Sequence, residues 1–413
     1  MLIANVILQQ IFRFNIGFDF LTLITAKNMK ITESIKYIGV DDTDLDLFES
    51  QYIIPNGISY NSYFIEDEKI AIMDSVDSRK SEEWLALVDE TLQGRTPDYL
   101  IVQHMEPDHA GSIQLIAEKY PTMQIVASAR AIQMLPQFFH EAEFDSRTIA
   151  VKEGDTLSLG SHTLQFFMAP MVHWPEVMVT YELSEKILFS ADGFGKFGAL
   201  SHDEEWACEA RRYYFNICGK YGQQVQALLK KAAMLDIAQI CPLHGPILSE
   251  NLDYYIGLYN TWSSYSPEAK GVFIAYASIH GGTAKAAEAF AEMLRAKGVE
   301  KVSTTDLCRD DMAEAIEDAF KYDRLVVAAS SYDADVFPPM YDFLHHLQLK
   351  NYQKRRVGII ENGSWAPCAG RVMRGMLEQM KNIEIVEPMV TIRSRMKPEN
   401  IPAMEALADA LAQ

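Results

Sequence analysis

The first half of the chain alternates short apolar runs with turns and helical stretches, from about Lys30 to Tyr259. Apolar runs of this length, bounded by turn residues, predict buried or half-buried strands. The clearest of them are Tyr99–Gln103, Leu164–Met168, Lys186–Ser190 and Ile237–Cys241. The stretch Trp262–Glu268 then has the Ser/Pro composition of a loop, and it is the best candidate for a linker.

The pattern starts again after this stretch. Val272–Ala277 predicts a buried strand, and Thr283–Lys297 predicts a helix with Phe290 and Leu294 on its apolar face. Gly298 is a suitable helix stop. Further strands are predicted at Lys301–Thr304, Arg324–Ala329 and Arg356–Glu361. Strands that alternate with helices imply a parallel α/β sheet.

Length and charge narrow the class of protein. The 413 residues predict two or three domains, at about 100–200 residues per domain. The formal net charge is −20, from 37 basic and 57 acidic side chains. Because an acidic surface repels phosphate backbones and anionic lipid heads, we expect neither nucleic acid nor a membrane as partner.

The five cysteines are widely spaced, and no CxxC motif occurs. This pattern predicts a reducing, cytoplasmic compartment and no disulfide framework. It also argues against a cysteine-held iron–sulfur cluster or a rubredoxin-type iron site in this chain.

Residues 1–28 are apolar but interrupted by Gln9, Gln10, Arg13 and Asp19. They contain no uninterrupted apolar run of the roughly 20 residues that a membrane span needs, and no secretory signal pattern. We interpret them as a non-native or disordered extension, produced by a start codon assigned upstream of Met29. A weak peripheral anchor is the alternative.

The strongest chemical signal is the motif His104-Met105-Glu106-Pro107-Asp108-His109, which directly follows the strand Tyr99–Gln103. In an extended chain His104 and Glu106 point the same way. We expect a helix to begin near Gly111, which would leave Asp108 and His109 in the turn before it. Four side chains of metal-ligand type therefore converge within six residues.

Three more ligand-type residues, His173, Asp192 and His244, follow the carboxyl ends of later predicted strands. Open α/β sheets place their sites at these ends. The total of four imidazoles and three carboxylates is too large for one tetrahedral zinc ion and suits two metal ions. A mixed imidazole and carboxylate set suits iron.

This motif set resembles the metallo-β-lactamase fold, and Glu106 at the third motif position resembles flavodiiron proteins (A-type flavoproteins) rather than the hydrolases of that fold. The contexts His173-Trp174-Pro175 and Ala191-Asp192-Gly193 are similar to that family as well. The resemblance implies that one iron is held by His104, Glu106 and His173 and the other by Asp108, His109 and His244. Asp192 would bridge them.

The second half carries a different pattern at the end of its first strand. Val272–Ala277 runs into a loop of hydroxyl and glycine residues that opens the next helix, namely Ser278, Ile279, His280, Gly281, Gly282 and Thr283. Hydroxyl groups and free backbone N–H groups at a helix N-terminus bind phosphate. Because no lysine is present as in a P-loop, a nucleoside triphosphate is not expected.

Two later loops also leave the carboxyl ends of predicted parallel strands, so all three loops line one crevice. These loops contain Ser330, Ser331, Tyr332 and Asp333, and Asn362, Gly363, Ser364 and Trp365. Tyr332 and Trp365 offer flat surfaces to an aromatic ring. This half resembles a flavodoxin-like FMN domain, with His280 where such loops often carry Thr or Tyr.

The two resemblances imply an α/β protein with a metallo-β-lactamase-like αββα sandwich followed by a flavodoxin-like doubly wound parallel sheet. We expect domains at residues 29–262 and 271–413, joined by a linker at 263–270. They further imply an oxidoreductase in which FMN and two Fe reduce dioxygen to water, nitric oxide to nitrous oxide, or both.

The family also implies a head-to-tail homodimer or a dimer of dimers. Because nothing follows the flavodoxin-like half beyond Gln413, we expect an external electron donor, rubredoxin or a similar small redox protein. Two alternatives stay open at this point. One is a hydrolase of the metallo-β-lactamase fold with an appended flavodoxin, and the other is a non-enzymatic electron-transfer flavoprotein.

Overall fold

The computed structural model describes residues 30–139, 144 and 146–413, and the predicted extension at residues 1–28 lies outside them. The chain divides into two compact units. The first unit contains the chain up to Glu209 together with Lys230–Leu252, and the second contains Ala210–Leu229 and Asp253–Gln413. Among the helices of the described residues, none is long and apolar enough to cross a membrane.

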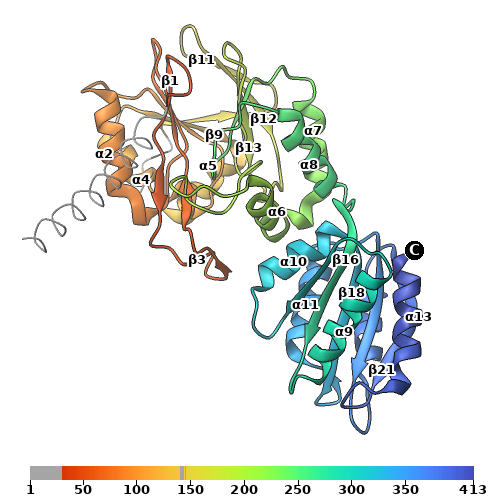
Figure 1. Ribbon diagram of the computed structural model, residues 1–413. Coiled ribbons are helices and arrows are strands. Elements are labelled where there is room, and N and C mark those ends of the chain that lie inside the picture. Colours follow the sequence, from red (N-terminus) through yellow and green to blue (C-terminus); the bar gives the residue numbers. More distant parts are fainter. Residues whose placement is uncertain (1–29, 140–143, 145) are drawn as a thin grey trace, which may run out of the picture. The chain divides into compact units, whose positions relative to one another are not determined.

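The first unit is built around two sheets that face each other (Figure 1). One sheet has the order β1 (Ile35–Tyr37), β6 (Tyr63–Ile65), β7 (Ala71–Met73), β8 (Tyr99–Val102), β9 (Gln124–Ser128) and β10 (Thr148–Val151). The other has the order β11 (Thr156–Ser158), β12 (Thr163–Met168), β13 (Met178–Glu182), β14 (Ile187–Phe189) and β15 (Gln239–Cys241). Two small two-stranded antiparallel sheets pair β2 (Val40–Asp42) with β5 (Ile58–Tyr60), and β3 (Leu47–Phe48) with β4 (Tyr52–Ile53).

Apolar side chains from both sheets form one core. Ile101 and Val126 of the first sheet pack with Phe166 and Phe189 of the second, and all four are fully buried. Burial of each such side chain contributes about 1.5–3 kcal/mol. The α-helices between β7 and β10 are α2 (Ser81–Leu92), α3 (Pro107–Ala110), α4 (Ile113–Lys119) and α5 (Ala129–Phe138).

The second unit contains a parallel sheet of order β17 (Val302–Asp306), β16 (Ala269–Ala277), β18 (Tyr322–Tyr332), β20 (Arg355–Asn362) and β21 (Ile383–Ile392). The short strand β19 (Asp335–Val336) pairs with β18. In chain order this sheet reads 2-1-3-4-5, the order of flavodoxin-like folds.

Helices cover both faces of this sheet (Figure 1). On one face Phe290 of α9 and Leu407 of α13 pack against Ile274 and Val326 of the central strands. On the other face Phe273 meets Phe343 of α11. These helices are α9 (Gly282–Ala296), α10 (Met312–Lys321), α11 (Pro338–Leu349), α12 (Ala369–Leu377) and α13 (Ile401–Ala412). Because the central strands are buried on both sides, their sequences read as continuous apolar runs.

Three more helices belong mostly to the second unit: α6 (Trp206–Ile217), α7 (Gly222–Ala232) and α8 (Leu252–Ser263). Helix α8 includes Trp262 and Ser263, where the sequence predicts a loop, and β16 already begins at Ala269. The reason is tertiary: Trp262 is buried, and its indole N–H donates to Glu268 at 2.8 Å.

Candidate metal centre

The six-residue motif leaves the first sheet at the end of β8 and divides between an extended segment and a helical turn. His104 and Glu106 lie in the extended part, with 3.2 Å between Nε2 and Oε2. Asp108 and His109 do not lie in a turn before a helix, as expected, but within the short helix α3. Pro107 explains the difference, since its fixed φ favours the first position of a helix.

The second sheet supplies the other three side chains from loops at one end of its strands. His173 follows β12, Asp192 follows β14 and His244 follows β15. The turn at Asp192 is tight: Ala191 has a φ of +50°, and Gly193 donates its N–H to the Ser190 carbonyl at 3.0 Å. The seven side chains thus come together in the fold, although they are spread from position 104 to position 244 of the sequence.

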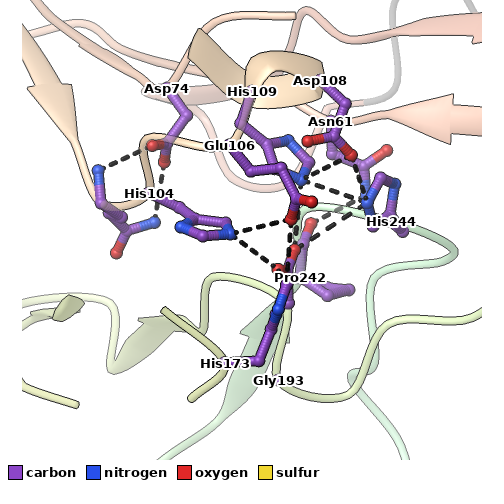
Figure 2. A network of polar contacts seen from close by, with 12 residues as sticks. Asn61, Asp74, His104, Glu106, Asp108, His109, His173, Gly193, Pro242 and His244 are labelled. Atoms are coloured by element: carbon purple, nitrogen blue, oxygen red, sulfur yellow. Dashed lines mark hydrogen bonds and ion pairs between the residues drawn. The ribbon is translucent and has the colours of Figure 1, made fainter. Parts of the chain in front are cut away.

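Six of these side chains point toward a common centre in Figure 2. Their potential ligand atoms form two groups, each within 4.8 Å: His104, Glu106, His173 and Asp192, and Asp108, His109 and His244. In the first group, His173 Nε2 lies 3.0 Å from Glu106 Oε2. In the second, the Nε2 atoms of His109 and His244 lie 3.1 Å apart, and His244 Nε2 lies 3.2 Å from Asp108 Oδ2.

Asp192 stands between the two groups and gives one oxygen to each. Its Oδ2 lies 3.3 Å from His104 Nε2 and 3.1 Å from His173 Nε2. Its Oδ1 lies 3.1 Å from His109 Nε2 and 3.8 Å from His244 Nε2. A carboxylate placed in this way can bridge two metal ions.

The donor set fits metal ions rather than a hydrogen-bonded core. Metal–ligand bonds of about 2.1 Å at ordinary angles separate neighbouring ligand atoms by about 3.0–3.4 Å, which is the spacing found here. Among the described residues, both carboxylate oxygens of Asp108 and Oδ1 of Asp192 are buried and form no well-oriented hydrogen bond, although imidazole nitrogens of the site lie 3.1–3.3 Å from Asp192 Oδ1 and Asp108 Oδ2. Buried polar atoms are normally partnered, so these atoms point to a cation.

The charges of the site also favour a cation. Burial lowers the pKa of His173, but hydrogen bonds to Asp192 and Glu106 outweigh it and raise this pKa to about 9. Burial raises the pKa of Asp192, but the neighbouring His104 and His109 outweigh this effect and hold the pKa well below its usual range. Metal ions therefore compete with protons held by these imidazoles, and binding would release protons.

Residues that the sequence motifs did not identify orient these ligands. Glu176 is buried, and its Oε1 accepts hydrogen bonds from His104 Nδ1 at 2.8 Å and from the Met105 N–H at 2.9 Å. His244 Nδ1 donates to the Ser59 carbonyl at 2.7 Å. Both bonds fix the tautomer that turns Nε2 toward the centre. The only sequence signal for Glu176 is an acidic residue three positions after His173.

The β3–β4 hairpin and one aromatic residue border the site. Phe48 is buried, and its ring meets the His244 ring edge-on at 5.6 Å. Trp174 meets the His104 ring in the same way at 5.4 Å. At the hairpin turn, burial and then the charge of Glu106 raise the pKa of the Glu49 carboxyl to about 7. These contacts make one side of the centre apolar and the Glu106 side acidic.

The second unit holds the other predicted site at the carboxyl edge of its sheet. The loop after β16 leads to Gly281, which has a φ of +81° and stands at the N-cap of helix α9. Glycine has no side chain, so it does not cap the first N–H groups of the helix. The Ser278 hydroxyl is buried and has no hydrogen-bond partner among the described residues. Thr283 is buried and lies 2.9 Å from the Ser330 hydroxyl. This loop fits a phosphate group, which would give Ser278 and the helix N–H groups acceptors.

The other predicted residues of this edge differ in role. Ile279, Tyr332 and Trp365 are 39%, 46% and 89% exposed, which leaves apolar surface for a ligand ring. Ser331 is committed within the protein, because its hydroxyl accepts the N–H groups of Cys368 and Ala369 at the start of α12. His280, Asp333, Gly363 and Ser364 lie in the three loops, as predicted. Gly282 and Thr283 instead begin helix α9, and the strands extend further than predicted, so that β18 includes Ser330, Ser331 and Tyr332 and β20 includes Asn362.

A fourth loop, after β21, completes this edge and was not predicted. Asn362 donates to Thr283 Oγ1 at 3.3 Å and to the Ser394 carbonyl at 3.1 Å, and it accepts the Ser394 N–H at 3.0 Å. Ser364 and Ser394 share a hydrogen bond of 2.6 Å. The fourth loop therefore joins the first and third loops.

Known proteins are similar to this chain in sequence and in fold. Residues 58–245 match the family described as ODP family beta lactamase. The nitric oxide reductase of Moorella thermoacetica is 31% identical over 386 residues, which cover 89% of this chain and 94% of that protein. The chain spans 64% or less of the cyanobacterial diflavin flavoproteins that it also matches.

Solved structures agree over nearly the whole chain. The rubredoxin oxygen:oxidoreductase of Desulfovibrio gigas has a TM-score of 0.86 at 25% identity and covers 93% of this chain and 98% of its own. The flavodiiron protein of Giardia intestinalis has a TM-score of 0.85 at 23% identity and covers 93% and 96%. The predicted pair of folds, metallo-β-lactamase-like and flavodoxin-like, is confirmed.

Proposed function

The chain belongs to the flavodiiron protein family, and we propose from this premise that it reduces dioxygen to water, nitric oxide to nitrous oxide, or both. The reaction would depend on FMN and a diiron centre. The observation that carries the proposal is the position of Asp192, whose two oxygens face two separate groups of buried ligand atoms.

We assign one iron to His104, Glu106 and His173, the other to Asp108, His109 and His244, and the bridge to Asp192. When bound, two ferrous ions and a reduced flavin supply the four electrons that convert dioxygen to water, while two nitric oxides need only two. Seven protein ligands shared between two irons leave coordination positions for a small molecule.

The protein's own contribution is orientation and exclusion of water. Glu176 and the Ser59 carbonyl hold His104 and His244 with Nε2 directed inward. The Glu106 side chain is 13% exposed, whereas those of His104, His109 and His244 are fully buried. A small molecule would therefore approach from the Glu106 side, with Phe48 and Trp174 limiting entry of bulk water.

In the second unit, Ser278, Thr283 and the start of α9 would hold the FMN phosphate, and Tyr332 and Trp365 would flank the isoalloxazine. The unpartnered Ser278 hydroxyl and the exposed Trp365 support this assignment. Electrons would come from rubredoxin or a similar small protein, in line with the name of the Desulfovibrio gigas relative.

The site of action and the assembly are part of the same proposal. All five cysteines are free thiols, which supports a reducing, cytoplasmic compartment. A head-to-tail homodimer would bring the flavin of one chain to the irons of another. This arrangement rests on the family resemblance, and light scattering of the purified protein tests it.

The deciding experiment is anaerobic stopped-flow oxidation of the fully reduced, iron-loaded protein with dioxygen and, separately, with nitric oxide. Fast flavin reoxidation by one gas identifies the substrate and shows that flavin and irons exchange electrons. Slow reoxidation by both gases would refute the proposal and favour a hydrolase of this fold, for which metal analysis should then find zinc.

A further inference from the structure

The fourth loop of the flavin edge, Arg393–Lys397, carries charges that no site described so far uses. Arg393 and Arg395 flank Ser394, and both are exposed. In the described part of the chain, neither arginine forms an ion pair. Other arginines of the same unit do pair with glutamates, namely Arg295 with Glu292, Arg356 with Glu384 and Arg374 with Glu387.

This loop is held against the phosphate loop. Ser394 is bonded to Asn362 through both its N–H and its carbonyl, at 3.0 and 3.1 Å. A Cβ atom added to Gly282 would lie 2.4 Å from the Ser394 carbonyl oxygen, so only glycine allows the two loops to come this close. The arginines are therefore carried at the border of the predicted flavin crevice.

The loop is also fixed at its far end. Asn400 accepts the Lys397 N–H at 2.9 Å and donates to the Thr391 carbonyl at 3.2 Å. A loop ordered at both ends loses little conformational entropy when a partner binds. Lys397 of this loop lies 3.7 Å from the Glu399 carboxylate, whereas no described carboxylate forms an ion pair with Arg393 or Arg395, although the chain has a net charge of −20.

We propose that the Arg393–Lys397 loop is the docking site for an acidic face of the small electron-donor protein. The proposal rests on the proposed function, because it requires that electrons enter through the flavin. Opposite charges would draw the donor to the flavin edge and raise the rate of encounter, while the acidic remainder of the surface would repel it elsewhere. Each docking event would transfer one electron, so two donors are oxidised for each flavin fully reduced.

A free anion site is a weaker explanation. Phosphate sites gather several donors around one point, and they bury them at least in part. Arg393 and Arg395 are instead both exposed on a turn, with Ser394 between them at a φ of +64°. Spread, solvated cations of this kind act mainly on association rate, and their effect falls as salt is added.

The test uses the FMN- and iron-loaded full chain and a reduced rubredoxin of net negative charge. Stopped-flow absorbance under anaerobic conditions gives the second-order rate constant for flavin reduction between low and high ionic strength. The charge-reversal variant is R393E/R395E. The matched control is K301E/K381E, which makes the same change in net charge at two exposed residues before β17 and β21, the opposite edge of the sheet.

We expect R393E/R395E to lower the rate constant at low ionic strength by about 10-fold or more and to flatten its salt dependence. The control should stay within about 2-fold of wild type. FMN content and the rate of reduction by a neutral photoreduced deazaflavin should not change in either variant, which would exclude a folding or flavin-binding defect.

Three outcomes would overturn the proposal. The first is a rate constant in R393E/R395E equal to that of the control. The second is loss of FMN from R393E/R395E with an unchanged rate per bound flavin, which would make the loop part of the flavin phosphate site. The third is a wild-type protein that the acidic donor does not reduce at any salt concentration. Failure of the gas-reductase function is separate, since it appears as slow reoxidation of a flavin already reduced.

Discussion

The most informative single perturbation is Glu176→Ala, because Glu176 is not itself a predicted ligand and, among the described residues, His104 is the one predicted ligand whose side chain it is seen to contact. Its Oε1 accepts two buried donors, His104 Nδ1 at 2.8 Å and the Met105 N–H at 2.9 Å. Each buried donor left without a partner costs about 1–3 kcal/mol. We therefore expect the metal-free protein to lose about 2–6 kcal/mol of its free energy of unfolding.

The same change should weaken one iron more than the other. Loss of a partner that orients a metal-binding histidine typically lowers metal affinity about 10–100-fold, or about 1.4–2.7 kcal/mol. Competition with a chelator, followed by metal analysis, should show early release of one iron per chain while the second is retained. FMN content should stay at the wild-type level, since the flavin residues lie in the other unit.

Two further variants make this test specific. Glu176→Gln keeps one acceptor oxygen in a side chain of nearly the same size. It should therefore lose less than half of the iron-binding free energy that Glu176→Ala loses. Glu185→Ala removes an exposed carboxylate from the same unit and should behave as wild type. If Glu176→Ala retains two irons with the wild-type chelator midpoint, then the proposed orienting role of the His104–Glu176 bond is wrong.

Three other expectations can be checked with the same protein. His109→Ala should lower iron content at one position and leave FMN bound, and metal analysis that finds two full irons would contradict the assignment. Ser278→Ala and Thr283→Val should each weaken FMN retention on dialysis, and Ser278→Ala should do so without lowering the melting temperature because its hydroxyl has no partner among the described residues. Unchanged flavin stoichiometry would mean that the phosphate loop is misplaced. Burial raises the pKa of Glu317 to about 8, although Arg211 lies 3.0 Å away. This pKa is above the ordinary value of 4.5, so the folded protein favours the protonated Glu317 carboxyl. Its contribution to the free energy of unfolding is fully present below about pH 4.5 and is lost as pH rises toward 8, by at most about 1.4 kcal/mol per pH unit. Glu317→Gln should therefore flatten the fall in stability between pH 5 and 8, and a variant with the wild-type slope would show that another group causes it.

The convergence of the seven predicted ligand side chains could be expected from the sequence because their signal is local. Four of the seven lie within one six-residue motif, and His173, Asp192 and His244 each follow a strand whose apolar run is easy to identify. Ends of neighbouring strands meet at one edge of a sheet, so the pattern of strands already implies that these residues converge.

The remaining parts of the sites depend on contacts that no local pattern encodes. Glu176 reaches His104 across 72 positions in the sequence, and the Phe48 hairpin meets His244 only in the folded chain. Ser394 joins the flavin edge because β21 happens to end there, next to Asn362. The loop predicted at Trp262 failed for the same reason, since a buried indole overrode Ser and Pro composition.

Four of the predicted ligands follow a strand of the first sheet and three follow strands of the second. Bound metal would therefore hold the two sheets together. It would close chain segments of up to 140 residues, from His104 to His244, and it would favour the folded state over any form in which the sheets separate. The slowest hydrogen exchange in the loaded protein should then be found in β8, β14 and β15 together. Removal of the metal should release all three at once, so that metal supply sets how long a newly made chain survives proteases.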